Sequence, residues 1–140
     1  MTEINRYLPT LGRILIAAIF LLSGFGKLAD PAGTLAYIRS AGVPLPTLSY
    51  AVAATIEVGG GILLILGYRT RFVAAIVAFF TLATALSFHT HFADQNQMIH
   101  FFKNIAMVGG LLQIMAFGAG AFSLDARCAA LHPRQSAVLA

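Results

Sequence analysis

Residues 11–28 read LGRILIAAIFLLSGFGKL, an apolar run whose charged side chains are Arg13 and Lys27. Its length matches the roughly 17–25 residues with which a helix crosses about 30 Å of hydrocarbon. The run shows no strand alternation, and a segment in lipid has to satisfy its own backbone hydrogen bonds, so it predicts a membrane-spanning helix. No small-residue cleavage site is clear, and we interpret the run as a retained span instead of a signal peptide.

Three further apolar segments of similar length follow the first. The four predicted spans cover about residues 8–28, 48–66, 72–88 (with an extension to 92 left open) and 103–122. The 140-residue chain is 59% hydrophobic and only 10% charged, whereas about a quarter of the residues of a soluble domain are charged. We therefore predict an all-α integral membrane protein, with one four-helix bundle over residues 1–124.

The connections between the spans differ in character. Asp30 followed by Pro31 is a helix-start signal, so a short interfacial helix is predicted between the first two spans. The second connection, GYRTR, predicts a tight turn, and the third is a polar loop over residues 89–102 with three histidines. Residues 125–140 are polar and alanine-rich, which predicts a mobile C-terminal tail.

The distribution of positive charge predicts the orientation, because cytoplasmic loops carry an excess of Lys and Arg. With four spans, both termini share a side with the second connection, and that side carries six of the nine Lys and Arg residues. The six are Arg6, Arg13, Arg69, Arg71, Arg127 and Arg134, and the other side carries Lys27, Arg39 and Lys103. We therefore predict that both termini are cytoplasmic (N-in/C-in) and that the histidine loop faces outside.

The string Gly24-Phe25-Gly26-Lys27 invites a nucleotide-binding interpretation. A Walker loop requires Gly-x-x-x-x-Gly-Lys-Ser/Thr between a strand and a helix, whereas Lys27 is followed by Leu28 at the end of a membrane span. The two glycines are better explained by close helix approach. Two interpretations of Lys27 remain: an anchor that reaches the membrane interface, or the partner of an acid inside the bundle.

Such an acid is Glu57, near the centre of the second span in TIEVGGGILL, residues 55–64. An unpaired carboxylate at that depth costs several kcal/mol, so Glu57 has to be protonated, paired or open to a water-filled cavity. It could serve helix packing alone, as a neutral or salt-bridged residue. The alternative is a functional role, which acids within membrane spans often have.

Cationic and polar side chains of the other spans are candidate partners of Glu57. If the helices alternate in direction, Lys27, His89, Lys103 and Asn104 share the outer half of the membrane, and Arg13 enters from the inner side. Cations around an acid keep its proton off, and the resulting pocket suits an anionic or carbonyl-bearing ligand such as a quinone headgroup. We predict Glu57, Lys27 and His89 as catalytic residues, and Arg13, Lys103 and Asn104 as cofactor-binding residues, with quinone as the candidate cofactor.

Other functional classes fit the sequence less well. His89, His91, Asp94 and His100 match no tight metal-binding spacing, so no metal site is predicted. The single cysteine, Cys128, excludes dithiol chemistry within the chain. A net charge of +4 in so apolar a chain is interpreted as a determinant of membrane orientation, and no nucleic-acid partner is expected.

Four ordered motifs carry a family resemblance: LGRILIAAIFLLSGFGKL, IEVGGGILLILGYRTR, FH and FFKNIAMVGGLLQIMAFGAGAFSLD. Together they resemble the DoxX family, and within it the short YphA-type inner-membrane proteins, over about residues 11–125. The resemblance implies a multi-pass inner-membrane protein of four helices. It places the family's polar positions at Arg13, Lys27, Glu57, Lys103 and Asn104, with His89 matching a frequent histidine.

The resemblance implies an association with redox chemistry, since the family takes its name from a subunit of a quinol oxidase with thiosulfate:quinone oxidoreductase activity. This chain lacks the larger soluble part of the oxidase-associated subunits. Two functional classes therefore stay open. One is a quinone-binding redox protein that works with a partner protein. The other is a non-catalytic subunit or scaffold that holds a partner protein or a small hydrophobic molecule. Membrane lipid surrounds either, and a homo-oligomer is compatible with both.

Overall fold

The computed structural model describes residues 3–131, which form six α-helices and no strand. The helices are α1 (Ile4–Ala29), α2 (Pro31–Ser40), α3 (Pro46–Leu66), α4 (Thr70–Phe88), α5 (Gln95–Phe117) and α6 (Leu124–Leu131). Four of them, α1, α3, α4 and α5, are long and apolar enough to cross a membrane. The predicted all-α architecture with four spans is therefore confirmed, while the N-in/C-in orientation stays a prediction.

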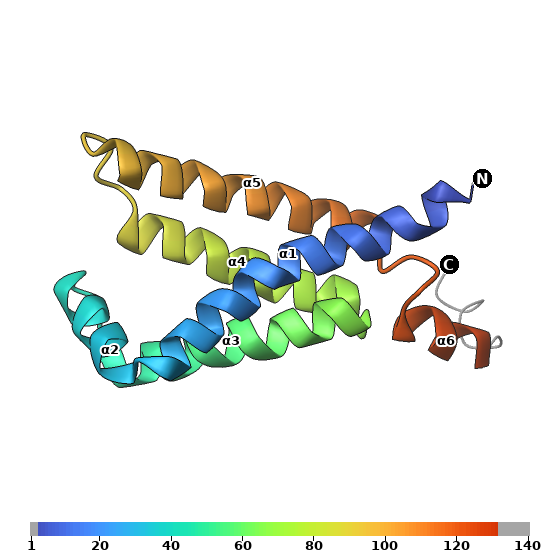
Figure 1. Cartoon of the computed structure of the whole chain (residues 1–140), viewed down its shortest axis with the longest axis horizontal. Helices are drawn as coiled ribbons and strands as arrows, with labels where there is room; N and C mark the ends of the chain where they lie inside the picture. The colour runs from blue at the N-terminus through green and yellow to red at the C-terminus, as the bar shows by residue number, and fades with distance from the viewer. Residues whose placement is uncertain (1–2, 132–140) are drawn as a thin grey trace.

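The four long helices form two closely packed pairs. Helix α1 packs along α3, α4 packs along α5, and the contact between α3 and α4 joins the pairs (Figure 1). The start of α1 lies at the same end of the bundle as α6, and α2 lies at the other end together with the loop between α4 and α5 (Figure 1). We call these the α6 end and the α2 end.

Small side chains allow the helices to approach closely. Ala17, Leu64 and Ala74 are fully buried at the centre of the bundle. A Cβ atom at Gly24 would lie 2.7 Å from Cγ2 of Val58, so α1 and α3 touch at this glycine. Close approach of this kind holds membrane helices together, because lipid provides no hydrophobic drive between them. Gly26 is also predicted to allow close helix approach. That prediction is wrong, because a Cβ atom at Gly26 would meet nothing within 4 Å.

The short helix predicted between the first two spans is present as α2. Its first turn begins as the sequence indicated, with the Asp30 side chain accepting a hydrogen bond of 2.9 Å from the backbone N–H of Gly33. Satisfying this otherwise unpaired N–H group stabilises the start of the helix.

The fourth span differs from its predicted bounds. Helix α5 begins at Gln95 instead of Lys103, and it ends at Phe117 instead of residue 122. The reason is the Asp94 side chain, which accepts a hydrogen bond of 2.8 Å from the N–H of Asn96 and so starts the helix in polar sequence. Lys103 and Asn104 consequently lie two turns inside α5, and the connecting loop is shorter than expected.

Helix α6 occupies the first part of the segment that was expected to be a tail. Asp125 connects it to the rest of the protein: its two carboxylate oxygens accept hydrogen bonds from the N–H groups of Arg69 and Thr70, at 2.7 and 2.9 Å. Its own N–H donates to the carbonyl oxygen of Gly67. The polar character of this segment thus reflects a contact with the α3–α4 turn. The remainder of the predicted tail lies outside the described residues.

Candidate functional site: a polar cavity at the α2 end

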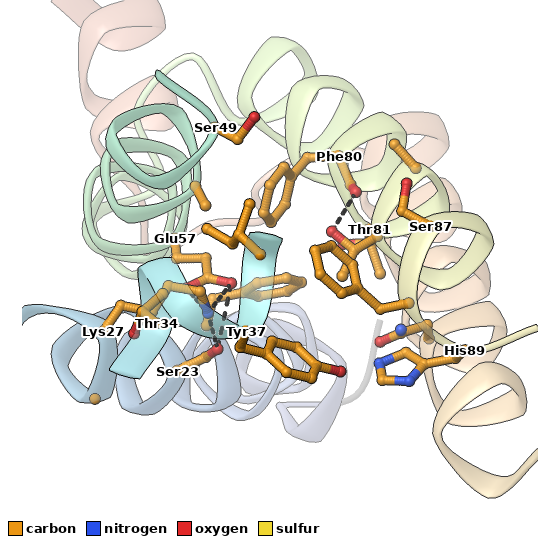
Figure 2. Close-up of a pocket in the computed structure, with 18 of the residues that line it drawn as sticks. Ser23, Lys27, Thr34, Tyr37, Ser49, Glu57, Phe80, Thr81, Ser87 and His89 are labelled. Carbon is orange, nitrogen blue, oxygen red and sulfur yellow. Dashed lines mark hydrogen bonds and ion pairs between the residues drawn. The ribbon is translucent and has the colours of Figure 1, made fainter. Parts of the chain in front are cut away.

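An ion pair between α1 and α3 is the centre of the site. Nζ of Lys27 lies 2.8 Å from Oε2 and 3.0 Å from Oε1 of Glu57. Ser23, one turn before Lys27 on α1, accepts a hydrogen bond from Nζ at 2.8 Å and donates one to Oε1 at 3.2 Å. Figure 2 shows these three side chains converging on one side of the cavity. Of the two interpretations of Lys27, the pairing with an acid is confirmed.

Burial is unequal across this ion pair. The side chain of Glu57 is 6% exposed and that of Lys27 is 24% exposed. Oε2 of Glu57 is buried and contacts Lys27 without a hydrogen bond of good geometry. A buried carboxylate with a close cation and one hydroxyl donor is far cheaper to hold in a membrane than an isolated one. The carboxylate keeps capacity to accept one more hydrogen bond.

The side of the cavity formed by α5 carries a second polar group. Nδ1 of His89, just after α4, lies 2.8 Å from Oε1 of Gln97. Nζ of Lys103 lies 2.9 Å from Nδ1 of His100, and the rings of His89 and His100 stack with centroids 5.2 Å apart. A carboxamide oxygen only accepts, so a neutral His89 carries its hydrogen on Nδ1 and has its acceptor at Nε2. An ammonium only donates, so His100 accepts at Nδ1.

Asn104 is the buried polar residue on the same helix. It is 8% exposed, and within residues 3–131 its carboxamide makes no hydrogen bond. The amide atoms of Asn104 are not among the fully buried side-chain atoms without a partner, so they reach accessible space and are able to bond a molecule there. The position of Asn104 on the cavity wall therefore marks a place where a bound molecule or water would supply the missing partner.

These groups surround one cavity of about 670 Å³. Its polar lining residues include Ser23, Lys27, Glu57, His89, His100, Lys103 and Asn104, and its larger apolar lining residues include Ile19, Phe20, Ile38, Phe80, Phe88 and Met107. In Figure 2, His89 faces the Lys27–Glu57 pair from the opposite wall. Five of the six predicted site residues thus line a single cavity.

Helix α2 covers the end of this cavity. The ring of Tyr37 stacks on Phe88 of α4 with centroids 5.3 Å apart, and Ile38 is 4% exposed. Tyr37 and Ile38 of α2 both line the cavity. The Tyr50 hydroxyl donates to the carbonyl oxygen of Lys27 at 3.3 Å, which fixes the end of α1 next to α3. Only a helix start was visible here in the sequence, so the covering role of α2 was not predicted.

The sixth predicted residue, Arg13, lies elsewhere. Its guanidinium is fully buried near the α6 end and donates to the carbonyl oxygens of Leu64, Ile65 and Phe122. Fourteen residues separate Arg13 from Lys27 on α1, or roughly 21 Å at 1.5 Å per residue. Arg13 does not line the cavity. The cofactor-binding role of Arg13 stays a prediction, while these hydrogen bonds join α1, the end of α3 and the segment before α6.

Sequence reasoning also missed members of the site. Ser23 lies four residues before Lys27, a spacing that places both on one helix face, and this signal was available. The contacts of His100 and Gln97 depended on the earlier start of α5, which was not foreseen. Within residues 3–131, no three His, Cys, Asp or Glu side chains lie close enough together to hold a metal ion.

Comparison with known proteins finds one matching family and two similar inner membrane proteins. The family model described as DoxX matches residues 8–90. Inner membrane protein YphA of Escherichia coli K12 is 38% identical over 123 residues, which cover 84% of this chain and 87% of that protein. Inner membrane protein YqjF of the same organism is 39% identical over 113 residues, covering 81% of this chain and 85% of that protein. No solved structure matches the chain significantly.

Proposed function

We propose that this chain, which belongs to the DoxX family and is a multi-pass inner-membrane protein, binds a quinone or quinol in the cavity at its α2 end. The observation that carries the proposal is the carboxamide of Asn104, a mostly buried residue that has no hydrogen-bond partner among the described residues and lines the same cavity as the Lys27–Glu57 pair. A ligand with oxygen atoms at its edge would accept hydrogen bonds from the amide of Asn104 and from the ammonium group of Lys27.

The shape and chemistry of the cavity favour a flat, mostly apolar ring. A volume of about 670 Å³ falls within the roughly 300–1,000 Å³ of small-molecule sites, which combine apolar walls with a few placed polar groups. Phe20, Phe80 and Phe88 line the space between the two polar walls, and aromatic side chains pack favourably on a conjugated ring. A quinone has such a ring, with carbonyl oxygens on opposite edges that only accept hydrogen bonds.

The polar residues then have distinct roles. Asn104 and Lys103 are donors for one carbonyl oxygen, and Lys27 is the donor on the opposite wall. Oxidation of a quinol to a quinone releases two protons and two electrons. Glu57 and His89 are the proton acceptors, through a carboxylate oxygen and Nε2 respectively. We assign the electrons to a partner protein that carries a flavin, haem or metal centre, because redox cofactors carry this chemistry.

The proposal is tested by extracting the molecules that the protein retains after gentle purification and identifying them by mass spectrometry. Wild-type protein should retain quinone in near-stoichiometric amount, and Asn104→Leu and Lys103→Met should each lower the retained amount by about tenfold, or about 1.4 kcal/mol. Gln113→Leu is the matched control, because Gln113 lies on the same helix, is exposed and does not line the cavity.

Two results would contradict the proposal. One is wild-type protein that neither retains quinone nor binds it when it is added. The other is quinone retention that is unchanged in Asn104→Leu. If a partner protein copurifies with the wild type and with every cavity variant while no quinone is found, the scaffold interpretation would replace this one.

A further inference from the structure

A ligand can enter the cavity only where its ends and sides are not covered by side chains. At the α2 end, the stacked rings of Tyr37 and Phe88 and the buried side chain of Ile38 cover part of it, and the exposed residues Asp30 and Gly33 form a polar edge. At the opposite end, α3 and α4 meet. A Cβ atom at Gly60 of α3 would come within 2.7 Å of Cγ2 of Val77 of α4, so no ligand passes between the helices there.

Between these two levels, residues of both α3 and α4 line the cavity and are exposed, which indicates a side opening. Val52 of α3 lines the cavity and is 45% exposed. On α4, Ala83 and Ser87 also line the cavity and are exposed. In Figure 2, Ser49 of α3 and Ser87 of α4 lie on this side of the cavity, with Phe80 drawn between them. Both helices are membrane spans, so Val52 and Ala83, which lie inside them, face lipid.

A second opening, between α1 and α5, has a different character. Ser23 and Lys103 line the cavity and are exposed there. The ammonium group of Lys103 would be desolvated by a hydrocarbon chain laid across it, which costs free energy. The α3–α4 seam has small and apolar side chains at its edge and no charged lining residue from either helix other than the buried Glu57.

We propose that the ligand is a long-chain amphiphile that enters from the bilayer, with its polar ring in the cavity and its hydrocarbon chain leaving between α3 and α4. This inference rests on the proposed function, and it names the class of quinone: one with an isoprenoid or similar tail, in contrast to a tailless quinone from water. The small side chains of Ala83 and Ser87 leave the width that a chain needs, and the chain keeps its contact with lipid.

The test compares a long-chain quinone with a tailless one of the same ring, in nanodiscs, with concentrations expressed per membrane lipid. Ala83→Trp and Ser87→Trp place a large ring in the seam. Each should weaken binding of the long-chain quinone by at least about tenfold more than it weakens binding of the tailless quinone. Ala106→Trp is the matched control, because Ala106 is an exposed alanine of α5 that does not line the cavity.

The outcomes separate the two proposals. If wild-type protein binds neither quinone, the proposed function fails. If it binds both, and the two seam variants leave long-chain binding intact, quinone binding stands and the α3–α4 exit is wrong. Equal weakening of both quinones by both variants also overturns the exit, because a blocked chain path should act only on the quinone that has a chain.

Discussion

Nζ of Lys27 lies 2.8 Å from Oε2 of Glu57, although the two residues are 30 positions apart and belong to different membrane-spanning helices. Separating the two charges at this depth would cost free energy, because Glu57 is buried. The hydroxyl of Ser23 also bonds to both members of the pair. The pair therefore fixes α1 against α3 and at the same time presents charge to the cavity.

Removal of both members of this pair should be less harmful than the sum of the two single removals. We expect Lys27→Ala and Glu57→Gln each to lower the free energy of unfolding by about 2–4 kcal/mol, slightly below the range for wholly buried pairs because Lys27 is partly exposed. The double variant should lose at least 1 kcal/mol less than the sum, roughly the coupling of residues in contact. Denaturant titration of the four proteins in detergent measures this coupling, and simple additivity would contradict it.

Arg13 should matter for stability and leave ligand retention unchanged. Arg13→Met removes donors to Leu64, Ile65 and Phe122 and leaves their carbonyl oxygens without this partner, at a cost of roughly 3 kcal/mol. The thermal unfolding temperature should fall, while folded Arg13→Met protein at low temperature retains as much quinone as the wild type. A selective loss of quinone from folded protein would return Arg13 to the site.

Two glycines of α1 should respond in opposite ways to alanine. At Gly24 the added Cβ would lie 2.7 Å from the Val58 side chain and 3.2 Å from its backbone nitrogen, so the helices have to move apart, at a cost of about 1–3 kcal/mol. At Gly26 the space is open, and alanine is the better helix former by up to about 1 kcal/mol. Thermal stability in detergent separates the two, and equal effects would show that α1 and α3 do not meet at Gly24.

The orientation of the bundle is open to a labelling test. Thr90 lies in the loop at the α2 end and is exposed, so a cysteine placed there should react with a membrane-impermeant thiol reagent from the periplasmic side, in a Cys128→Ser background. The expectation follows from the excess of positive charge on the side of the termini. Reaction only after the inner membrane is opened would reverse the predicted N-in/C-in topology.

The sequence was informative where a single physical cost dominates. Apolar length predicted the four spans, and the cost of a bare carboxylate in lipid predicted a partner for Glu57. The start of α5 was missed because the local hydrogen bond of Asp94 outweighs hydropathy. The position of Arg13 was missed because its partners are backbone carbonyls, which every residue has and no motif reveals. The rotation of α5 places Asn104 in the cavity and Gln113 outside it. This rotation is set by packing between helices, so it could not be predicted from the sequence.

The hydrogen bonds of Arg13 have a consequence for the order in which the protein is made. One of its acceptors, the carbonyl oxygen of Phe122, follows 109 residues later in the chain, and Asp125, which binds the start of α4, follows later still. During synthesis, α1 thus enters the membrane with a guanidinium whose final partners have not yet left the ribosome. We therefore expect the hydrogen bonds at the α6 end to be the last to form, after residues 122–125 have been made.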